Sequence, residues 1–392
     1  MQKLQVIRII PFVAVATFAA WSVATRSFAQ EPVRPRLHGY STVVPWTGGT
    51  TDDALFQAAS GTTIPMAHYN VTGTRGTYSG VIVGGNPFGK DPDTVNLQAV
   101  VIPLIIQVWN GSTYTTFDPT KPNSCDGGVS AETRFKKSPL VSELTWSMNG
   151  VNVGDHQYIN AFMRAEFWNA TTVSKNLSDP IGFSFAASLT MPSAGPGFGT
   201  VQGSGCNAQG IVYKGFFDTF LNVNIAVLQS SGVISPTKFA VFLMKNVVLS
   251  SSSDFSNCCI GGYHGATGSP VQTFAVMDYD TSGQIGNFLD ISVPSHEIGE
   301  WMNDPLGTNP TPKWGNIGQV SGCQSNFEVG DPLSGTFATI TLNGYDYHVQ
   351  ELAFITWFFD PPGAISFGAG EKFSNGGSFS GPSYPCPPGG TY

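Results

Sequence analysis

Charged residues are scarce in this sequence: Asp, Glu, Lys and Arg together make up 11% of its 392 residues. The chain has only six histidines and nine glutamates, and its 18 Lys and Arg residues form no cluster. An acidic chain without a basic cluster binds nucleic acid and anionic membranes poorly, so we expect neither as a partner. Glycine, serine, threonine and aromatic residues are abundant instead, which is typical of secreted β-rich proteins.

The motifs of several common enzyme classes are also missing. The sequence contains no G-x-S-x-G elbow and no Walker loop, which disfavours a typical serine hydrolase or nucleotide-dependent enzyme. It has no C-x-x-C pair that would indicate a zinc ribbon or a redox centre. After the first thirty residues, no apolar run reaches the roughly 20 residues that a membrane-spanning helix needs.

The first thirty residues have the pattern of an export signal. Lys3 and Arg8 precede an apolar run over residues 9–24, and Ser27-Phe28-Ala29 offers the small residues that a signal peptidase reads. We predict a signal peptide over residues 1–29, cleavage near Ala29, and a secreted or periplasmic protein. Without this segment the chain keeps 15 Lys and Arg against 26 Asp and Glu, a formal net charge of −11.

Six cysteines follow the predicted export signal, so disulfide bonds are expected. The sequence does not select one pairing among the many that six cysteines allow. We expect the adjacent Cys258 and Cys259 to bond to different partners, and Cys386 to hold a tail rich in glycine and proline.

The rest of the chain is predicted to be an α+β protein with two regions. Residues 30–235 form a β-rich region, because short β-branched and aromatic runs alternate there with turn residues, and one helix is predicted over residues 157–168. Residues 236–392 form a region with a mixed sheet, in which residues 239–244 and 271–277 are predicted buried strands. The two regions could also form one continuous domain, because no clear linker separates them.

One short motif indicates a chemistry: H-E-x-x-E at His296, Glu297 and Glu300. On a helix, His296 and Glu300 project from the same face, and Glu297 stands about 100° round from His296. We predict His296 and Glu300 as metal ligands and Glu297 as the general base that activates a metal-bound water. Ser292 is the predicted N-cap, and residues 303–305 are predicted to end the helix. The alternative is a helix face with two solvated glutamates.

A catalytic metal needs a third protein ligand, and the candidates lie some thirty residues further on. Glu328 is the first choice. Asp331 is the second, either as a ligand or as a carboxylate that orients His296, although it could also belong only to a turn. His264 and His348 are reserves. A structural role is preferred for His348, which lies in a predicted strand, and His264, beside the cysteine pair, could reach the site only if disulfide bonds hold it there.

The predicted ligand set affects both the identity of the metal and its reactivity. Two carboxylates and one imidazole neutralise a divalent ion, so its bound water is less acidified than in a histidine-rich site. Zn²⁺ is the expected cofactor, but oxygen ligands make Mn²⁺, Mg²⁺ or Ca²⁺ more competitive. Whether the site is catalytic therefore depends on Glu300, a carboxylate ligand that makes the metal-bound water less acidic.

The motif and its surroundings resemble a group of secreted bacterial proteins with H-E-x-x-E-W-x-x-D-P helices, regarded as zincin-like metallopeptidases of the gluzincin type. Four other segments are similar to that group: residues 160–168, 313–316, 327–332 and 348–352. The resemblance implies a zincin-like C-terminal region and a protein or peptide substrate. It also implies His296 and Glu300 as zinc ligands and Glu297 as the base.

A second resemblance is to plant phosphate-induced proteins of the exordium type. It rests on residues 258–265, which include the cysteine pair and His264, and on residues 303–305. Those plant proteins are regarded as extracellular growth or adhesion factors. This resemblance implies the alternative function, a non-catalytic secreted cell-surface or binding protein with a vestigial metal site.

Overall fold

The computed structural model describes seven segments of the chain: residues 63–90, 94–148, 151–286, 288–315, 323–363, 365–366 and 372–373. The predicted signal peptide and Cys386 lie outside them. Cys125 is bonded to Cys206, with their Cα atoms 5.7 Å apart. Since these two cysteines bond to each other, neither is available to Cys258 or Cys259. The structure joins Cys258 to Cys259, so the expectation of different partners was wrong.

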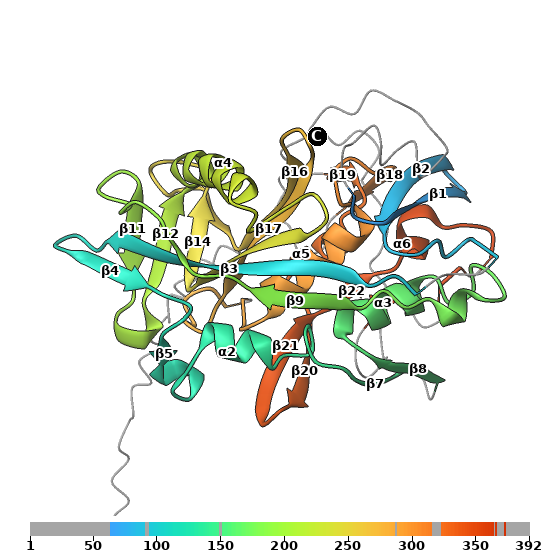
Figure 1. Ribbon diagram of the computed structural model, residues 1–392, viewed down its shortest axis with the longest axis horizontal. Helices are drawn as coiled ribbons and strands as arrows, with labels where there is room; N and C mark the ends of the chain where they lie inside the picture. Colours follow the sequence, from blue (N-terminus) through green and yellow to red (C-terminus); the bar gives the residue numbers. More distant parts are fainter. Residues whose placement is uncertain are drawn as a thin grey trace, which may run out of the picture. The chain divides into compact units, whose positions relative to one another are not determined.

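A seven-stranded sheet runs through the described part of the chain (Figure 1). In spatial order its strands are β10 (Leu189–Thr190), β3 (Leu97–Trp109), β13 (Phe239–Lys245), β17 (Gln272–Tyr279) and β16 (Gly262–Thr267), and β4 (Tyr114–Phe117) and β9 (Ile181–Phe185) also pair with β3. β3, β13 and β17 run parallel, whereas β16 is antiparallel to β17. Strands from both sides of residue 236 therefore share this sheet.

The two faces of this sheet pack into two different hydrophobic cores. Neighbouring strand residues such as Val241 and Phe242 belong to opposite cores, because side chains alternate along a strand. Burial on both faces explains why the strands appear as continuous apolar runs in the sequence. One face packs against α4 (Lys214–Ser230) through residues that include Phe217 and Leu221. This helix was not predicted from the sequence.

The opposite core contains α3 (Tyr158–Glu166) and α5 (Ser292–Asn303). All twelve residues of α5 are buried, and the helix packs against β16, β17, β21 and α3. Its N-cap is Ile291, whose carbonyl accepts a hydrogen bond from the N–H of Ser295, so Ser292 was wrongly predicted as the N-cap. The helix ends at Asn303, as predicted.

The other strands form smaller sheets. β11 (Gly199–Gln202), β12 (Gln209–Tyr213), β14 (Val247–Ser250) and β15 (Cys258–Ile260) make a four-stranded sheet. Six further pairs are β1 (Met66–Gly73) with β2 (Gly76–Val83), β5 (Pro122–Asn123) with β6 (Val129–Ser130), β7 (Leu144–Met148) with β8 (Val151–His156), β18 (Pro310–Gly315) with β19 (Cys323–Asn326), β20 (Phe337–Leu342) with β21 (Tyr345–Gln350), and β22 (Leu352–Ala353) with β23 (Lys372–Phe373).

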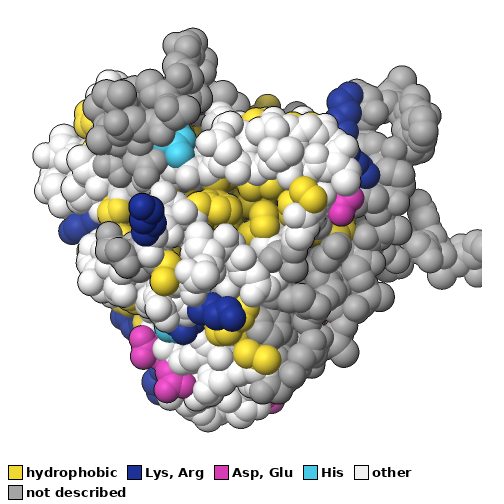
Figure 2. Space-filling view, turned by 90° about the vertical axis from the view of Figure 1, so that its right-hand side faces the viewer, with side chains coloured by type: hydrophobic (Ala, Val, Ile, Leu, Met, Phe, Trp, Pro, Cys, Tyr) yellow, Lys and Arg dark blue, Asp and Glu magenta, His cyan; other side chains and the backbone are white. Residues whose placement is uncertain are grey.

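The short helices are α2 (Ala131–Lys136) and α6 (Ile355–Phe359), and single 3₁₀ turns lie at η1 (Ser124–Asp126), η2 (Ser174–Asn176), η3 (Gly205–Asn207) and η4 (Asp331–Leu333). The predicted α+β class, with a β-rich N-terminal region and mixed sheets, is confirmed. Within the segments described, no helix has the length and apolar character needed to cross a membrane. Charged side chains are few on the face shown in Figure 2, where basic groups lie scattered among polar and apolar ones.

Candidate metal centre

Six ionisable side chains from three parts of the fold meet around α5, and we call them the acid–histidine cluster. They are His296, Glu297 and Glu300 from α5, His264 from β16, and Glu328 and Asp331 from the segment after β19. His264 lies on β16, an edge strand of the sheet, and pairs with Ala275 of β17. α5 packs against both strands. None of the six side chains is more than 1% exposed, so the cluster is closed to solvent in this conformation.

The first group within the cluster is formed by His296, Glu300 and Asp331, which offer ligand atoms within 4.8 Å of one another. Nε2 of His296 lies 2.9 Å from Oε1 of Glu300, because residues four apart face each other on a helix. The same nitrogen lies 3.6 Å from Oδ1 of Asp331. Gln324 holds the other oxygen of Asp331 by donating from Nε2 to Oδ2 at 2.5 Å.

The second group is formed by His264, Glu300 and Glu328, within the same distance limit. Nδ1 of His264 lies 3.5 Å from Oε2 of Glu300, and its Nε2 lies 3.8 Å from Oε2 of Glu328. Nε2 of His264 is also 2.9 Å from the backbone oxygen of Asp304, and Asn326 donates to Oε1 of Glu328 at 2.7 Å. Glu300 is therefore common to both groups.

The structure brings the predicted ligands His296 and Glu300 together, but it places the two candidates for the third ligand beside different histidines. His296 and Glu300 lie side by side and are buried, so neither glutamate of the motif is solvated. Asp331, the second choice, lies beside His296. Glu328, the first choice, lies instead beside His264.

The two reserve histidines have different surroundings. His264 belongs to the cluster, and its Nδ1 is also 3.6 Å from Oε2 of Glu297. His348 does not: its Nδ1 lies 2.6 Å from Oδ2 of Asp290, which is not one of the six residues of the cluster. In the sequence, His264 was marked only as a reserve ligand and as part of residues 258–265, beside the cysteine pair; the structure places it in β16.

Many polar atoms of the cluster have no hydrogen-bond partner among the described residues. They are Nδ1 of His264, both carboxylate oxygens of Glu297, and Oε2 of Glu300 and of Glu328. Each buried polar atom left in this way costs about 1–3 kcal/mol, and a charged one costs more. A divalent cation would satisfy them, and imidazole nitrogen with carboxylate oxygen is a donor set that such ions accept. The residues present therefore fit a metal ion.

Gln350 of β21 positions the ring of His296. Its Nε2 donates to the backbone oxygen of Gly330 at 2.7 Å and lies 2.8 Å from Nδ1 of His296. When the ring is neutral, Nδ1 accepts this hydrogen bond and the ring proton is on Nε2, facing Glu300. A cation at Nε2 requires the amide of Gln350 to turn, so that its oxygen accepts a hydrogen bond from an N–H at Nδ1, and this breaks the hydrogen bond to the backbone oxygen of Gly330.

The charges of the cluster shift its pKa values in opposite directions. Burial alone would lower the pKa of both His264 and His296, but the neighbouring carboxylates raise both. Burial raises the pKa of Glu297 and of Glu328. Burial also opposes ionisation of Glu300, yet the two imidazoles outweigh it and lower the pKa of this carboxyl. Without a cation, the cluster is therefore an acidic site that holds protons on its histidines.

Two glycines provide space for the cluster because they have no side chain. A Cβ atom added at Gly330 would lie 2.6 Å from Cγ and 2.8 Å from Cε1 of His296. A Cβ atom added at Gly262 would lie 2.6 Å from Oε1 of Glu297. The two glycines lie within residues 258–265 and 327–332, but neither was predicted from the sequence to have a role in the site.

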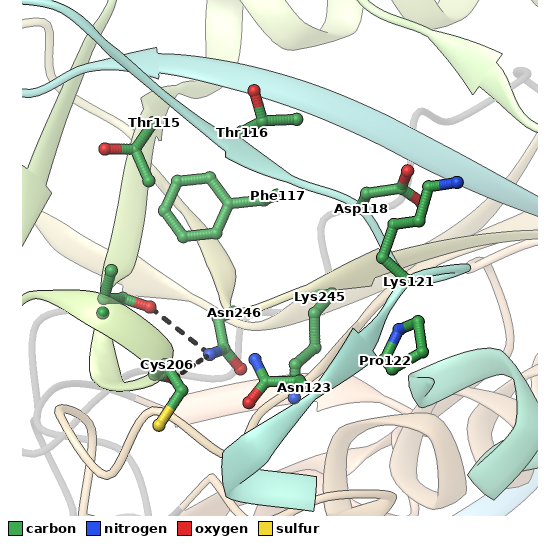
Figure 3. A pocket seen from close by; sticks show the side chains of 12 residues that line it. Thr115, Thr116, Phe117, Asp118, Lys121, Pro122, Asn123, Cys206, Lys245 and Asn246 are labelled. Carbon is green, nitrogen blue, oxygen red and sulfur yellow. Dashed lines mark hydrogen bonds between the residues drawn. The ribbon is translucent and has the colours of Figure 1, made fainter. Parts of the chain in front are cut away.

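A separate pocket of about 340 Å³ lies on another part of the molecule (Figure 3). It is lined by residues of β4, β5 and η3, together with Lys245 and Asn246. None of the six residues of the acid–histidine cluster lines it. Lys245 is already engaged, since its Nζ lies 2.6 Å from Oδ2 of the buried Asp126. We therefore assign this pocket no part in the metal chemistry.

No protein-family model, curated protein or solved structure matches this chain. The resemblances described from the sequence therefore remain predictions. The geometry of the acid–histidine cluster is the basis for assigning a function to this chain.

Proposed function

We propose that this chain is a secreted metal-dependent hydrolase that cleaves peptide bonds. The observation that carries the proposal is the buried convergence of His296, Glu300 and Asp331 on and beside α5, with Glu297 next to His296 on the same helix. The disulfide between Cys125 and Cys206 supports an oxidising compartment outside the cytoplasm.

In this proposal His296, Glu300 and Asp331 hold the metal, and Asp331 replaces Glu328 as the third ligand because it is the carboxylate beside His296. A divalent ion at this position supplies Lewis acidity toward a substrate carbonyl and makes water easier to deprotonate. Glu297 is the base. Both of its oxygens lack hydrogen-bond partners among the described residues, so they are available to accept a proton from water and deliver it to the leaving group.

The first test is metal analysis of the purified protein, combined with a hydrolysis assay on a peptide library. Glu297→Gln should lower the rate by about 10²–10⁴-fold while the bound metal stays, because general-base catalysis contributes that much. Glu166→Gln is the matched control. Glu166 is another fully buried glutamate, but it lies outside the cluster and accepts a hydrogen bond from the N–H of Ile355. Equal rates for wild type and Glu297→Gln would exclude Glu297 as the base.

The complete burial of the cluster favours a second candidate, a non-catalytic secreted protein that uses a metal for stability. Structural metal sites are closed, whereas catalytic sites keep a position open to water and substrate. In that case, removal of the metal by a chelator should lower the melting temperature, and neither wild type nor Glu297→Gln should hydrolyse any peptide. Hydrolysis that is lost on chelation and restored by added Zn²⁺ would contradict it.

A further inference from the structure

Glu300 belongs to both groups of the acid–histidine cluster, and its two oxygens face different imidazoles. Oε1 lies 2.9 Å from Nε2 of His296, and Oε2 lies 3.5 Å from Nδ1 of His264. Asp331 completes the first group and Glu328 the second. A carboxylate that offers one oxygen to each of two ligand sets is placed as a bridging ligand would be in a two-metal centre.

We propose that the cluster holds two divalent cations, one at His296 and one at His264, bridged by the carboxylate of Glu300. The second cation takes Nδ1 of His264 and Oε2 of Glu300 as ligands. Glu328 is the third member of this group, and its Oε2 lies 3.8 Å from Nε2 of the same ring. The proposal rests on the metal centre of the proposed function, but it does not require that the protein hydrolyses peptides.

His264 is oriented as a metal ligand. Its Nε2 lies 2.9 Å from the backbone oxygen of Asp304, so an N–H at Nε2 donates to that oxygen and Nδ1 keeps its lone pair. Nδ1 is buried and has no hydrogen-bond partner among the described residues, and the same holds for Oε2 of Glu300 and of Glu328. Two ligands that each lie about 2.1 Å from one tetrahedral ion are roughly 3.4 Å apart. The 3.5 Å between Nδ1 and Oε2 of Glu300 matches this separation.

The charge of the cluster favours two cations over one. Four buried carboxylates meet here: Glu297, Glu300, Glu328 and Asp331. If both imidazoles are neutral ligands, one divalent ion leaves two negative charges uncompensated, whereas two ions neutralise all four. Since an unmatched buried charge costs several kcal/mol, the doubly loaded state is the better balanced one. Protonation of both histidines supplies only two positive charges, so without metal the four carboxylates are balanced only if Glu297 and Glu328, whose pKa burial raises, are protonated as well. The number of bound metal ions distinguishes this protonated state from the doubly loaded one.

The test is the number of metal equivalents that the full chain binds. Metal-free protein is loaded with Zn²⁺ alone or Mn²⁺ alone, freed of excess ion and analysed by mass spectrometry of the metal. His264→Gln removes the ligand at Nδ1 but keeps an amide that can donate to the backbone oxygen of Asp304, so the local fold is retained. His156→Gln is the matched control, because His156 contacts Asn160 and Arg164 outside the cluster. Circular dichroism confirms the fold of each variant.

We expect two equivalents in wild type and in His156→Gln, and one in His264→Gln. Crystals of the loaded protein should show two anomalous peaks about 3.5–4 Å apart, on either side of Glu300. One equivalent in wild type that His264→Gln leaves in place would overturn the second site and leave the proposed hydrolase intact. Two equivalents that His264→Gln does not change would also overturn it. Two equivalents that fall to one, without hydrolysis, would support the second site and count against the hydrolase.

Discussion

Gly330→Ala should damage the metal centre without changing any ligand. Gly330 has φ −85° and ψ −33°, a conformation open to alanine, so the substitution adds only a methyl group. That methyl would lie against Nδ1 of His296 and 2.6 Å from its Cγ, and restoring ordinary contacts of 3.4 Å to both atoms moves the ring by roughly 1 Å. The ring is fully buried and cannot turn into solvent. Metal–ligand distances tolerate only about 0.2 Å of error, so the ring can no longer serve as a ligand in its present place.

The expected result has two parts. Zn²⁺ affinity at the His296 position should fall at least about 10-fold, as it does when the support of a ligand is lost. The metal-free protein should also lose about 1–3 kcal/mol of unfolding free energy, which is the usual cost of overpacking a core. Titration with Zn²⁺ against a chromophoric chelator measures the first quantity, and urea unfolding measures the second.

Gly286→Ala is the matched control for this prediction. A Cβ atom at Gly286 meets nothing within 4 Å, so the substitution should leave metal binding unchanged and alter stability by less than about 1 kcal/mol. Wild-type Zn²⁺ affinity in Gly330→Ala would show that the ring of His296 is not a ligand in its present position.

Two further predictions concern parts of the molecule outside the cluster. Lys245→Met should lower the free energy of unfolding, measured in urea, by about 3–5 kcal/mol. The substitution leaves the carboxylate of Asp126, whose side chain is 0% exposed, without its cationic partner. Lys136→Met breaks a pair whose lysine is 42% exposed and should cost under about 1 kcal/mol; similar losses for both variants would refute the distinction. The hydrogen bond to Asp290 raises the pKa of His348, so this pair stabilises the fold fully below pH 6.5, and the stabilisation is lost as pH rises through the raised pKa. Asp290→Asn should remove that contribution to the pH dependence of the melting temperature, and an unchanged profile would contradict this assignment.

The sequence was sufficient to predict the central strands but not the helix α4. β13 and β17 are buried on both faces, so their apolar runs are unbroken and easy to identify. α4 contains three phenylalanines, two valines and one isoleucine, residues with high β-propensity, and it lies in a region that otherwise consists mostly of strands. Its helical signal was the spacing of Phe217, Leu221 and Ile225, which the overall β pattern obscured.

The site was predictable only as far as local geometry sets it. The contact between His296 and Glu300 follows from their spacing on one helix. His264 reaches the cluster through the pairing of β16 with β17, which no local pattern specifies. Glu328 and Asp331 are three residues apart, and the backbone path into η4, rather than residue type, decides which of them lies beside His296.

The complete burial of α5 has a consequence for how the chain tolerates substitution. An ordinary surface helix accepts changes on its outer side, so tolerance along it rises and falls every 3.6 residues. α5 has no outer side, since each of its positions from Ser292 to Asn303 is enclosed. A scan of all single substitutions should therefore find that substitutions are poorly tolerated at all twelve positions, without a periodicity of 3.6 residues. The same enclosure should make its backbone amides among the slowest in the protein to exchange with deuterium.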